Sequence, residues 1–246
     1  MRAIILAAGL GSRLMNKAGE IPKILIKVGG QTLLERHLRI LSDLSITEVV
    51  IGVGYKSNLI IDELINLKRE DVKLVYNPNF DQGSIVTLQK LAPELRQDGG
   101  IIIMDGDVLY DIRILKCLIN SKHENCFLLD RNIEDGEEPM KLAINNGSIV
   151  DFRKKIEKPC DYYGESVGFF KFSTTTAQSI ANTCSQMISS GLQEAYMEEV
   201  IRYELLKNPK IFAFEDITGL PWIEIDFPED LTKAETKILP SLIIGD

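Results

Sequence analysis

Short apolar runs alternate with segments of helical spacing along the first half of the chain. The apolar runs, many of them β-branched, are typical of strands that are covered on both faces. They fall at residues 3–8, 48–53, 72–76 and 100–104. Apolar residues three and four positions apart predict helices, and these fall at residues 32–44, 58–68 and 85–95. Because strands and helices alternate regularly, we predict a parallel sheet with crossover helices, which is an α/β fold.

The second half continues this alternation with one change. The expected helices lie at residues 112–120, 174–190 and 193–206, and the expected strands at 125–129, 162–172 and 211–215. From Lys141 onward, two short strands joined by an Asn-Asn-Gly turn predict an antiparallel hairpin. No internal repeat or low-complexity linker occurs, so we predict one domain over residues 1–246.

Composition and charge limit the kind of protein. Hydrophobic residues make up 45% of the 246 residues and charged residues 26%, as in ordinary soluble domains. The formal net charge is −8, so we expect no nucleic-acid partner, because such surfaces are basic. No apolar stretch is long enough to cross a bilayer, and the apolar start is too short for a signal peptide. We therefore expect a cytoplasmic location and no membrane insertion.

Cysteine and histidine chemistry has little support in the sequence. The four cysteines show no CxxC pair and no metal-ligand spacing, which favours reduced thiols. The two histidines, His37 and His123, lie outside any partner motif, and we expect both to be structural.

The first predicted strand ends at two glycines. Gly9 and Gly11 allow a tight turn that brings backbone N–H groups close to a bulky anion, and a polyphosphate suits such a site. Arg13 adds a forked cation and Lys23 a mobile one. The order is not the GxGxxG of dinucleotide folds, because Leu14 stands where the third glycine would be. A plain glycine turn with incidental surface cations is the alternative.

Carboxylates follow two further apolar segments. Asp105 and Asp107 end the strand at residues 100–104, at the sheet edge that also carries the glycine turn. Their hard oxygens suit a nucleotide-bound Mg²⁺, which takes one or two ligands from protein. Asp105 acts through water or caps the next helix. Near the carboxyl end, Asp226 and Glu224 alternate with apolar residues, and we expect one of the two carboxylates to point away from the other.

The string LAAGLGSR at residues 6–13, followed by Pro22-Lys23, resembles the signature of the nucleotidyltransferase superfamily. That superfamily includes sugar-1-phosphate nucleotidylyltransferases and phosphocholine cytidylyltransferases. The short chain and the ending WIEIDFPEDL are similar to the phosphocholine and aminoethylphosphonate cytidylyltransferase branch. The resemblance implies a Rossmann-like (GT-A type), mostly parallel mixed sheet flanked by helices. It also implies an inserted antiparallel hairpin and strand, at about residues 139–172, that hold the acceptor.

The resemblance also implies roles for individual residues. Catalytic roles fall on Arg13, Lys23, Asp107 and Asp226, and the last two are the expected Mg²⁺ ligands. Nucleotide contacts are expected at Leu6, Ala8, Gly9, Gly11, Ser12, Arg13, Lys23, Gln82, Gly83, Ser84 and Asp105. For Gln82 to Ser84, a plain helix entry with Ser84 as the cap is an equal alternative. Acceptor contacts are expected at Lys141, Arg153 and Glu165.

Together these residues predict a magnesium-dependent transfer of CMP from CTP to a small phosphorylated alcohol or phosphonate, with release of pyrophosphate. Phosphocholine, phosphoethanolamine and 2-aminoethylphosphonate are acceptors of this type. Little proton chemistry is needed, because the attacking oxygen is already anionic. One alternative is a sugar 1-phosphate acceptor with UTP, GTP or dTTP. Another is a non-catalytic nucleotide-binding regulatory module, which would have no chemical need for all four catalytic residues.

Two features of the expected partners stay open at this point. An aromatic cage for a quaternary ammonium group would require folding to bring together Tyr110, Tyr162, Tyr163 and Trp222. The oligomeric state is not fixed by the sequence, and a homodimer is one option.

Overall fold

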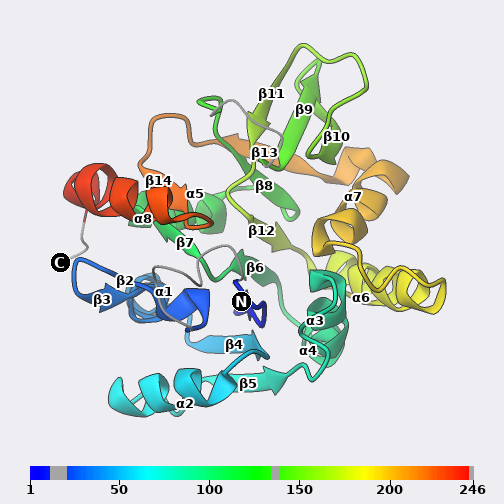
Figure 1. Cartoon of the computed structure of the whole chain (residues 1–246). Helices are drawn as coiled ribbons and strands as arrows, with labels where there is room; N and C mark the ends of the chain where they lie inside the picture. Colours follow the sequence, from blue (N-terminus) through cyan, green and yellow to red (C-terminus); the bar gives the residue numbers. More distant parts are fainter. Residues whose placement is uncertain (12–20, 134–138, 244–246) are drawn as a thin grey trace.

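The computed structural model describes residues 1–11, 21–133 and 139–243. Its centre is a seven-stranded sheet, and Figure 1 shows the strands side by side through the middle of the molecule. In spatial order the strands are β13 (Ala213–Asp216), β8 (Cys126–Leu129), β12 (Phe169–Phe172), β6 (Ile101–Asp105), β1 (Arg2–Ala7), β4 (Glu48–Val53) and β5 (Lys73–Tyr76). Only β12 runs antiparallel to its neighbours. The predicted mixed, mostly parallel sheet is confirmed.

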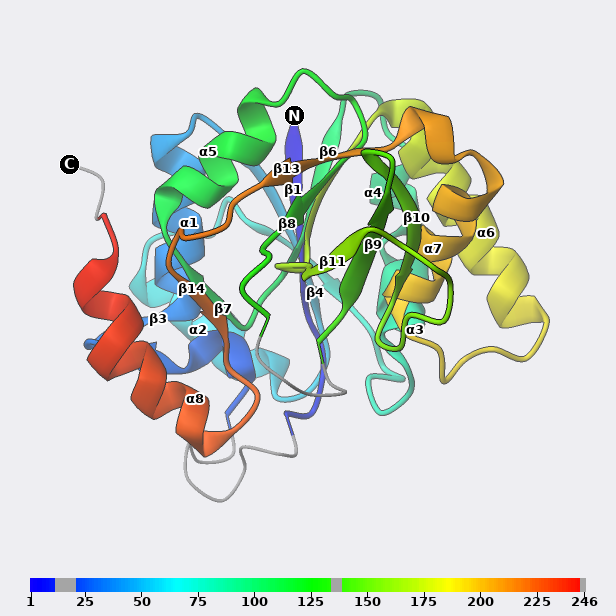
Figure 2. The same ribbon diagram turned by 90° about the horizontal axis from the view of Figure 1, so that it is seen from above.

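Helices cover both faces of this sheet (Figures 1 and 2). One face carries α1 (Leu33–Asp43), α2 (Ser57–Asn66) and α5 (Ile112–Asn120). The other carries α3 (Ser84–Lys90), α4 (Ala92–Leu95), α6 (Thr174–Ser189) and α7 (Met197–Lys207). Because side chains alternate along a strand, Ile5 of β1 packs into the first layer and Ile4 into the second. An apolar run without polar gaps is what this two-sided burial requires.

A second, three-stranded sheet lies beside α7 (Figure 1). Its order is β10 (Ser148–Arg153), β9 (Lys141–Asn145) and β11 (Tyr162–Glu165), all antiparallel. The β9–β10 turn places Asn146 at φ 49° and Gly147 at φ 70°. Two successive positive φ values characterise the tight hairpin turn, which an Asn-Gly pair adopts at low cost. The predicted hairpin is therefore confirmed, and β11 extends it.

A two-stranded ribbon completes the edge of the molecule. It pairs β7 (Val108–Tyr110) with β14 (Trp222–Glu224), and α8 (Pro228–Lys233) follows it. A small apolar cluster lies under this ribbon and α8. The remaining short elements are β2 (Lys27–Val28), β3 (Gln31–Thr32), the 3-10 helices Lys23–Leu25, Pro209–Ile211 and Leu239–Ser241, and a π-helix at Ala234–Ile238. Among the described residues, no helix combines the length and apolar character needed to cross a membrane.

Two predicted elements are split in the structure. The helix expected at residues 85–95 is interrupted at Leu91, after which Pro93 takes an early position in α4. Proline has no N–H to continue the helical hydrogen bonds. The strand expected at residues 162–172 is also two strands, β11 and β12, which belong to different sheets. Between them Gly168 has φ 77°, a conformation that redirects the chain.

Candidate active site

The glycine turn after β1 forms one side of two adjoining cavities. Gly9 and Leu6 line both cavities, Gly11 lines the first and Ala8 the second. Gly11 has φ 61°, and a Cβ there would lie 3.0 Å from Cγ of Lys23. A larger residue at this position would therefore disturb the lysine. The predicted contacts Ser12 and Arg13 lie outside the described residues.

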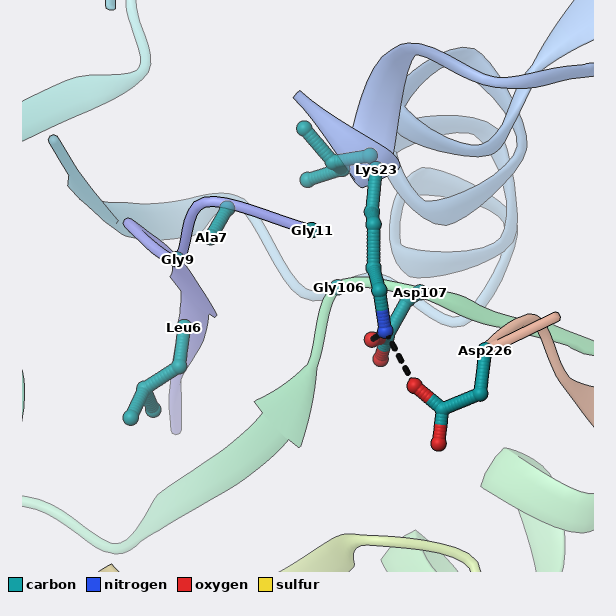
Figure 3. A pocket seen from close by; sticks show the side chains of 9 residues that line it. Leu6, Ala7, Gly9, Gly11, Lys23, Gly106, Asp107 and Asp226 are labelled. Carbon is teal, nitrogen blue, oxygen red and sulfur yellow. Dashed lines mark hydrogen bonds and ion pairs between the residues drawn. The ribbon is translucent and has the colours of Figure 1, made fainter. Parts of the chain in front are cut away.

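Lys23 projects between two of the predicted carboxylates (Figure 3). Its ammonium nitrogen lies 2.8 Å from Oδ2 of Asp107 and 2.5 Å from Oδ1 of Asp226. The lysine begins a short 3-10 helix whose next two residues, Ile24 and Leu25, are buried. Those apolar side chains fix the backbone from which the ammonium extends.

Asp107 stands in the turn between β6 and β7, and several backbone contacts hold this turn. The Gly106 N–H donates to the Leu6 carbonyl over 3.1 Å, and the Gly106 carbonyl lies 3.2 Å from Nε2 of buried His37. The Asp107 carbonyl accepts from the Ile225 N–H over 3.0 Å. The last bond ties the turn directly to the segment that carries Asp226.

Asp226 and Glu224 both reach the same place from the end of β14. Oxygens of Asp107, Glu224 and Asp226 lie within 4.8 Å of one another. The expectation that one carboxylate would point away from the other is wrong, because residues two apart on an extended strand share a face. Glu224 is therefore a site residue that the sequence reasoning missed, although strand alternation would have indicated it.

The charges in this group alter one another's ionisation. Burial alone would lower the pKa of Lys23, but Asp107 and Asp226 raise it above its ordinary value. Burial and then the charges of Asp107 and Asp226 raise the pKa of Glu224. Burial and then Glu198 and Asp107 raise the pKa of Asp105 well above its usual range.

Three carboxylates at this spacing fit a divalent cation. Mg²⁺ prefers hard oxygen ligands and commonly keeps several waters beside one or two carboxylates. Asp107 and Asp226, the predicted ligands, are both in the group, and Glu224 is a third candidate. In the structure the Lys23 ammonium supplies the positive charge between Asp107 and Asp226.

The second cavity has a volume of about 280 Å³, and Ser84 and Thr87 of α3 are among the residues that line it. Gln82 and Ser84 line it together with Phe80, whereas Gly83 does not. Gly83 instead donates its N–H to the Gln193 carbonyl over 3.0 Å, and a Cβ at Gly83 would collide with the Ala195 carbonyl. Its role in the structure is close packing.

Ser84 is not the cap of its own helix, as the alternative interpretation had it. It is the first residue of α3, and its hydroxyl accepts the Met197 N–H over 2.8 Å. Ser84 thus holds the beginning of α7 against α3.

Asp105 also lies in this cavity, at the end of β6. It does not cap the next helix, because Asp111 caps α5 and accepts the Arg113 N–H over 2.9 Å. The interpretation of Asp105 as a helix cap is therefore wrong. Its carboxylate packs against Gly168, where a Cβ would collide with Oδ2.

The predicted acceptor residues lie side by side on the three-stranded sheet, because Lys141 of β9 is the register partner of both Arg153 of β10 and Glu165 of β11. Arg153 pairs with Glu157 over 3.5 Å, and Lys141 donates to the Lys154 carbonyl over 3.1 Å. Glu165 lines a third cavity, which contains Trp222 and shares Glu224 and Asp226 with the second.

Among the described residues that line the second cavity, the cation is Lys154, which follows the predicted Arg153 in the sequence. Phe152 and Lys154 both line the cavity, and Arg153 lies between them in the sequence. Alternation along the strand end therefore places Arg153 on the other side. The acceptor contacts of Lys141 and Arg153 stay predictions, and Lys154 is a further candidate.

Glu198 is a further cavity residue that the sequence did not reveal. The pair Glu198-Glu199 in a predicted helix is usually a solvated face, yet Glu198 lines the second cavity beside Tyr196. Burial raises its pKa, although Lys154 opposes the rise. The contact of the segment before α7 with Gly83 puts Glu198 there, and no local pattern encodes that contact.

The tyrosines and the tryptophan considered for an aromatic cage do not surround one space, although Trp222 of β14 is the register partner of Tyr110 of β7. Tyr110 is buried in the core, whereas Tyr162 and Tyr163 are exposed on β11. Trp222 lines the third cavity and donates its indole N–H to Asp130 over 2.9 Å. Among the described residues these four rings do not enclose a common space.

The fold and this site define the class to which the chain belongs. The model of the MobA-like NTP transferase domain matches residues 3–144, which is more than half of the chain. The chain therefore belongs to the MobA-like NTP transferase domain family. The resemblance to nucleotidyltransferases that the first 23 residues carry is confirmed.

Several known proteins are similar to this chain over nearly its whole length. A CTP:phosphoglutamine cytidylyltransferase of Campylobacter jejuni is 25% identical and aligns over 94% of this chain and 98% of its own. A bifunctional IPC transferase and DIPP synthase of Aquifex aeolicus is 27% identical over 99% of this chain, which spans only 53% of that longer protein. The solved CTP:phosphocholine cytidylyltransferase of Streptococcus pneumoniae superposes with a TM-score of 0.73 at 22% identity, over 95% of this chain and 97% of that one. Sugar-phosphate nucleotidyltransferases also occur among the similar proteins.

Proposed function

We propose that this protein is a magnesium-dependent cytidylyltransferase. It transfers CMP from CTP to a small phosphorylated alcohol or phosphonate and releases pyrophosphate. The observation that carries the proposal is the convergence of Lys23, Asp107 and Asp226 at the boundary of two cavities that the glycine turn lines. CTP, rather than another nucleotide, is supported by the cytidylyltransferases among the relatives.

In the proposed reaction an oxygen of the acceptor phosphate or phosphonate attacks the α-phosphorus of CTP. A P–O bond forms there, and the bond to the bridging oxygen of the β-phosphate breaks. Its electron pair leaves with pyrophosphate. No proton has to move, so the residues act mainly by positioning and by neutralising charge.

Each side chain of the site has its own role in the proposed reaction. Lys23 leaves its carboxylate partners to stabilise the charge that develops at the α-phosphate. The N–H groups of the glycine turn hold the triphosphate. Arg13 is expected to stabilise the departing pyrophosphate. Gln82, Ser84 and Phe80 contact the nucleotide in the second cavity, and Lys154 binds the acid group of the acceptor there.

Asp107 and Asp226, with Glu224 beside them, would hold Mg²⁺. When bound, such an ion neutralises phosphate charge and orients the nucleotide. The positive charge that these carboxylates would hold adds to the charge that Lys23 brings to the site.

The proposal is tested by the release of pyrophosphate. The protein is incubated with Mg²⁺, each of the four nucleoside triphosphates, and a panel of acceptors that includes phosphoethanolamine, phosphocholine, 2-aminoethylphosphonate and glucose 1-phosphate. We expect release with CTP and a member of the phospho-alcohol or phosphonate group. Release only with UTP, GTP or dTTP and a sugar phosphate would contradict the cytidylyl assignment. No release with any pair would contradict the enzyme itself.

A further inference from the structure

Glu198 has a carboxylate that the transfer chemistry does not use. It stands in the first turn of α7 and lines the second cavity. Its Oε2 is enclosed by protein, and none of the described residues donates a hydrogen bond to it. A buried polar atom without a partner is costly, and more so when it is charged. This oxygen therefore points to a hydrogen-bond donor on a ligand.

The charges around Glu198 indicate a positively charged donor. Five carboxylates line this cavity, and Lys154 is the one described cation among its lining residues. Lys23 is nearby but is engaged by Asp107 and Asp226. Lys154 lies over the Tyr196 ring, with Nζ 5.2 Å from the centroid, and does not donate to Oε2 of Glu198. The carboxylates of the cavity thus outnumber its described cations.

Three of the four described aromatic rings that line the second cavity already pack against other groups, and the fourth, Phe80, is the one assigned to the nucleotide. Phe152 and Phe170 are 0% exposed and pack against each other at 5.8 Å between centroids. The ring of Tyr196 already has the Lys154 ammonium over it. A cation without N–H groups would therefore find neither a cage nor a way to satisfy Oε2.

We propose that Glu198 binds a primary ammonium group of the acceptor. The acceptor is then a short zwitterion, with a phosphate or phosphonate at one end and a protonated amine at the other. Lys154 binds the acid end and Glu198 accepts an N–H from the ammonium, both within one cavity. This proposal rests on the proposed function, because it identifies the acceptor of the same transfer.

Three matched phosphonates separate the possible groups. They are 2-aminoethylphosphonate, its 2-hydroxyethyl counterpart and its N-trimethylated counterpart. The dissociation constant of each is measured with Mg²⁺ and a CTP analogue whose α–β bridging oxygen is a methylene group, so that binding is read without turnover. We expect the amine to bind about tenfold or more tightly than the other two, because charge-assisted hydrogen bonds are the stronger ones.

The same binding measurements on variants test whether Glu198 causes the preference for the amine. Glu198→Gln keeps the shape but loses the charge, and we expect the preference for the amine to fall to about threefold or less. Glu198→Asp keeps the charge and serves if the first variant fails to fold, with a partial loss expected. Glu199→Gln is the matched control, since Glu199 pairs with Arg202 over 3.8 Å and does not line the second cavity. It should bind like the unaltered protein.

Other outcomes would overturn the proposal. Equal binding of the three phosphonates by the unaltered protein would do so, as would an unchanged preference in Glu198→Gln. Loss of the preference in Glu165→Gln instead would put the amine in the third cavity, where Glu165 lies. Failure to release pyrophosphate with any substrate pair would contradict the proposed function, but these binding constants would still decide the role of Glu198.

Discussion

Three other parts of the chain hold the Lys23 side chain in position. The glycine turn packs against its side chain, and its ammonium contacts Asp107 of the β6–β7 turn and Asp226 after β14. These two contacts span 84 and 203 residues of sequence. A lysine in this position holds the carboxylates together when no other cation does, and it is mobile enough to turn toward a phosphate.

Replacing this ammonium should abolish most of the turnover. We expect Lys23→Met to lower kcat by about 100-fold or more, because it removes charge stabilisation at the reacting phosphate. The KM for the acceptor should change little. Lys27→Met is a suitable control, since Lys27 is an exposed neighbour on β2. Both variants are assayed by pyrophosphate release, and near-normal kcat in Lys23→Met would contradict the assigned role.

At the residue scale, the sequence predicted the side chains that directly follow recognisable elements. Asp107 comes shortly after an apolar strand, and Lys23 follows Pro22 in the opening motif. Residues that depend on strand phase or on long-range packing were missed. Lys154 and Arg153 differ by one position, and a one-residue shift reverses the face of a strand. Glu198 reaches the cavity only because the segment before α7 packs on Gly83.

At the element scale, the junction between β11 and β12 connects the two sheets at the site. Gly168 lies there with φ 77°, and its carbonyl accepts the Asp105 N–H over 3.1 Å. The sequence favoured one continuous strand because residues 162–172 are rich in aromatic residues. A glycine within a strand pattern also marks a bend or a close approach, and here it marks both.

Two substitutions separate the effect of the contact between Gly168 and Asp105 from the effect of the positive φ of Gly168 on stability. Gly168→Ala should lower the free energy of unfolding by about 2–4 kcal/mol, because it adds a clash with Asp105 to the cost of positive φ. Gly147→Ala is the matched control, with φ 70° and open space around the added Cβ. It should cost about 1 kcal/mol. Urea unfolding measures both, and equal losses in the two variants would show that the contact with Asp105 does not matter.

At the scale of the whole molecule, the apolar layer that contains α1 packs behind the site. His37 of α1 lies in this layer beside Tyr110 and Phe169. His37 is 0% exposed and contacts the Gly106 carbonyl, next to Asp107. Burial lowers the pKa of His37 from 6.5 to about 4. The ring is therefore neutral in the folded protein, and this bears on how the fold responds to acid.

The sign of the pH effect follows from the lowered pKa. The contribution of His37 to stability is complete above about pH 6.5 and is lost as the pH falls toward 4, because the unfolded chain takes up the proton first. The full loss is about 3 kcal/mol. The pKa values of Asp105 and Glu224 are raised in the fold, so these two groups increase stability as the pH falls. The overall stability therefore does not isolate His37, and the protonation of His37 has to be followed at that residue.

NMR of the His37 ring resonances follows the protonation of this residue directly. They should keep their neutral-form shifts from pH 8 to about 5. A titration midpoint near 6.5 would contradict the buried, neutral ring.

Two segments from opposite ends of the chain form one site. The opening motif contributes Lys23 and the closing segment contributes Asp226, and the fold joins them across the sheet edge (Figure 3). The α/β class, the hairpin and the order of most elements could be predicted, because they follow from local periodicity. The convergence at the cavity could be inferred only through the resemblance, because it depends on the β7–β14 pairing.

The most direct test is a ³¹P NMR spectrum of the protein with CTP, Mg²⁺ and 2-aminoethylphosphonate, recorded beside that of Asp226→Asn. The unaltered protein should produce pyrophosphate and a new CMP-linked phosphorus signal in equal amounts. The variant, shown to be folded by circular dichroism, should produce neither at a comparable rate. Formation of the CMP-linked product at a near-normal rate by Asp226→Asn, or inorganic phosphate as the sole product of the unaltered protein, would contradict the account.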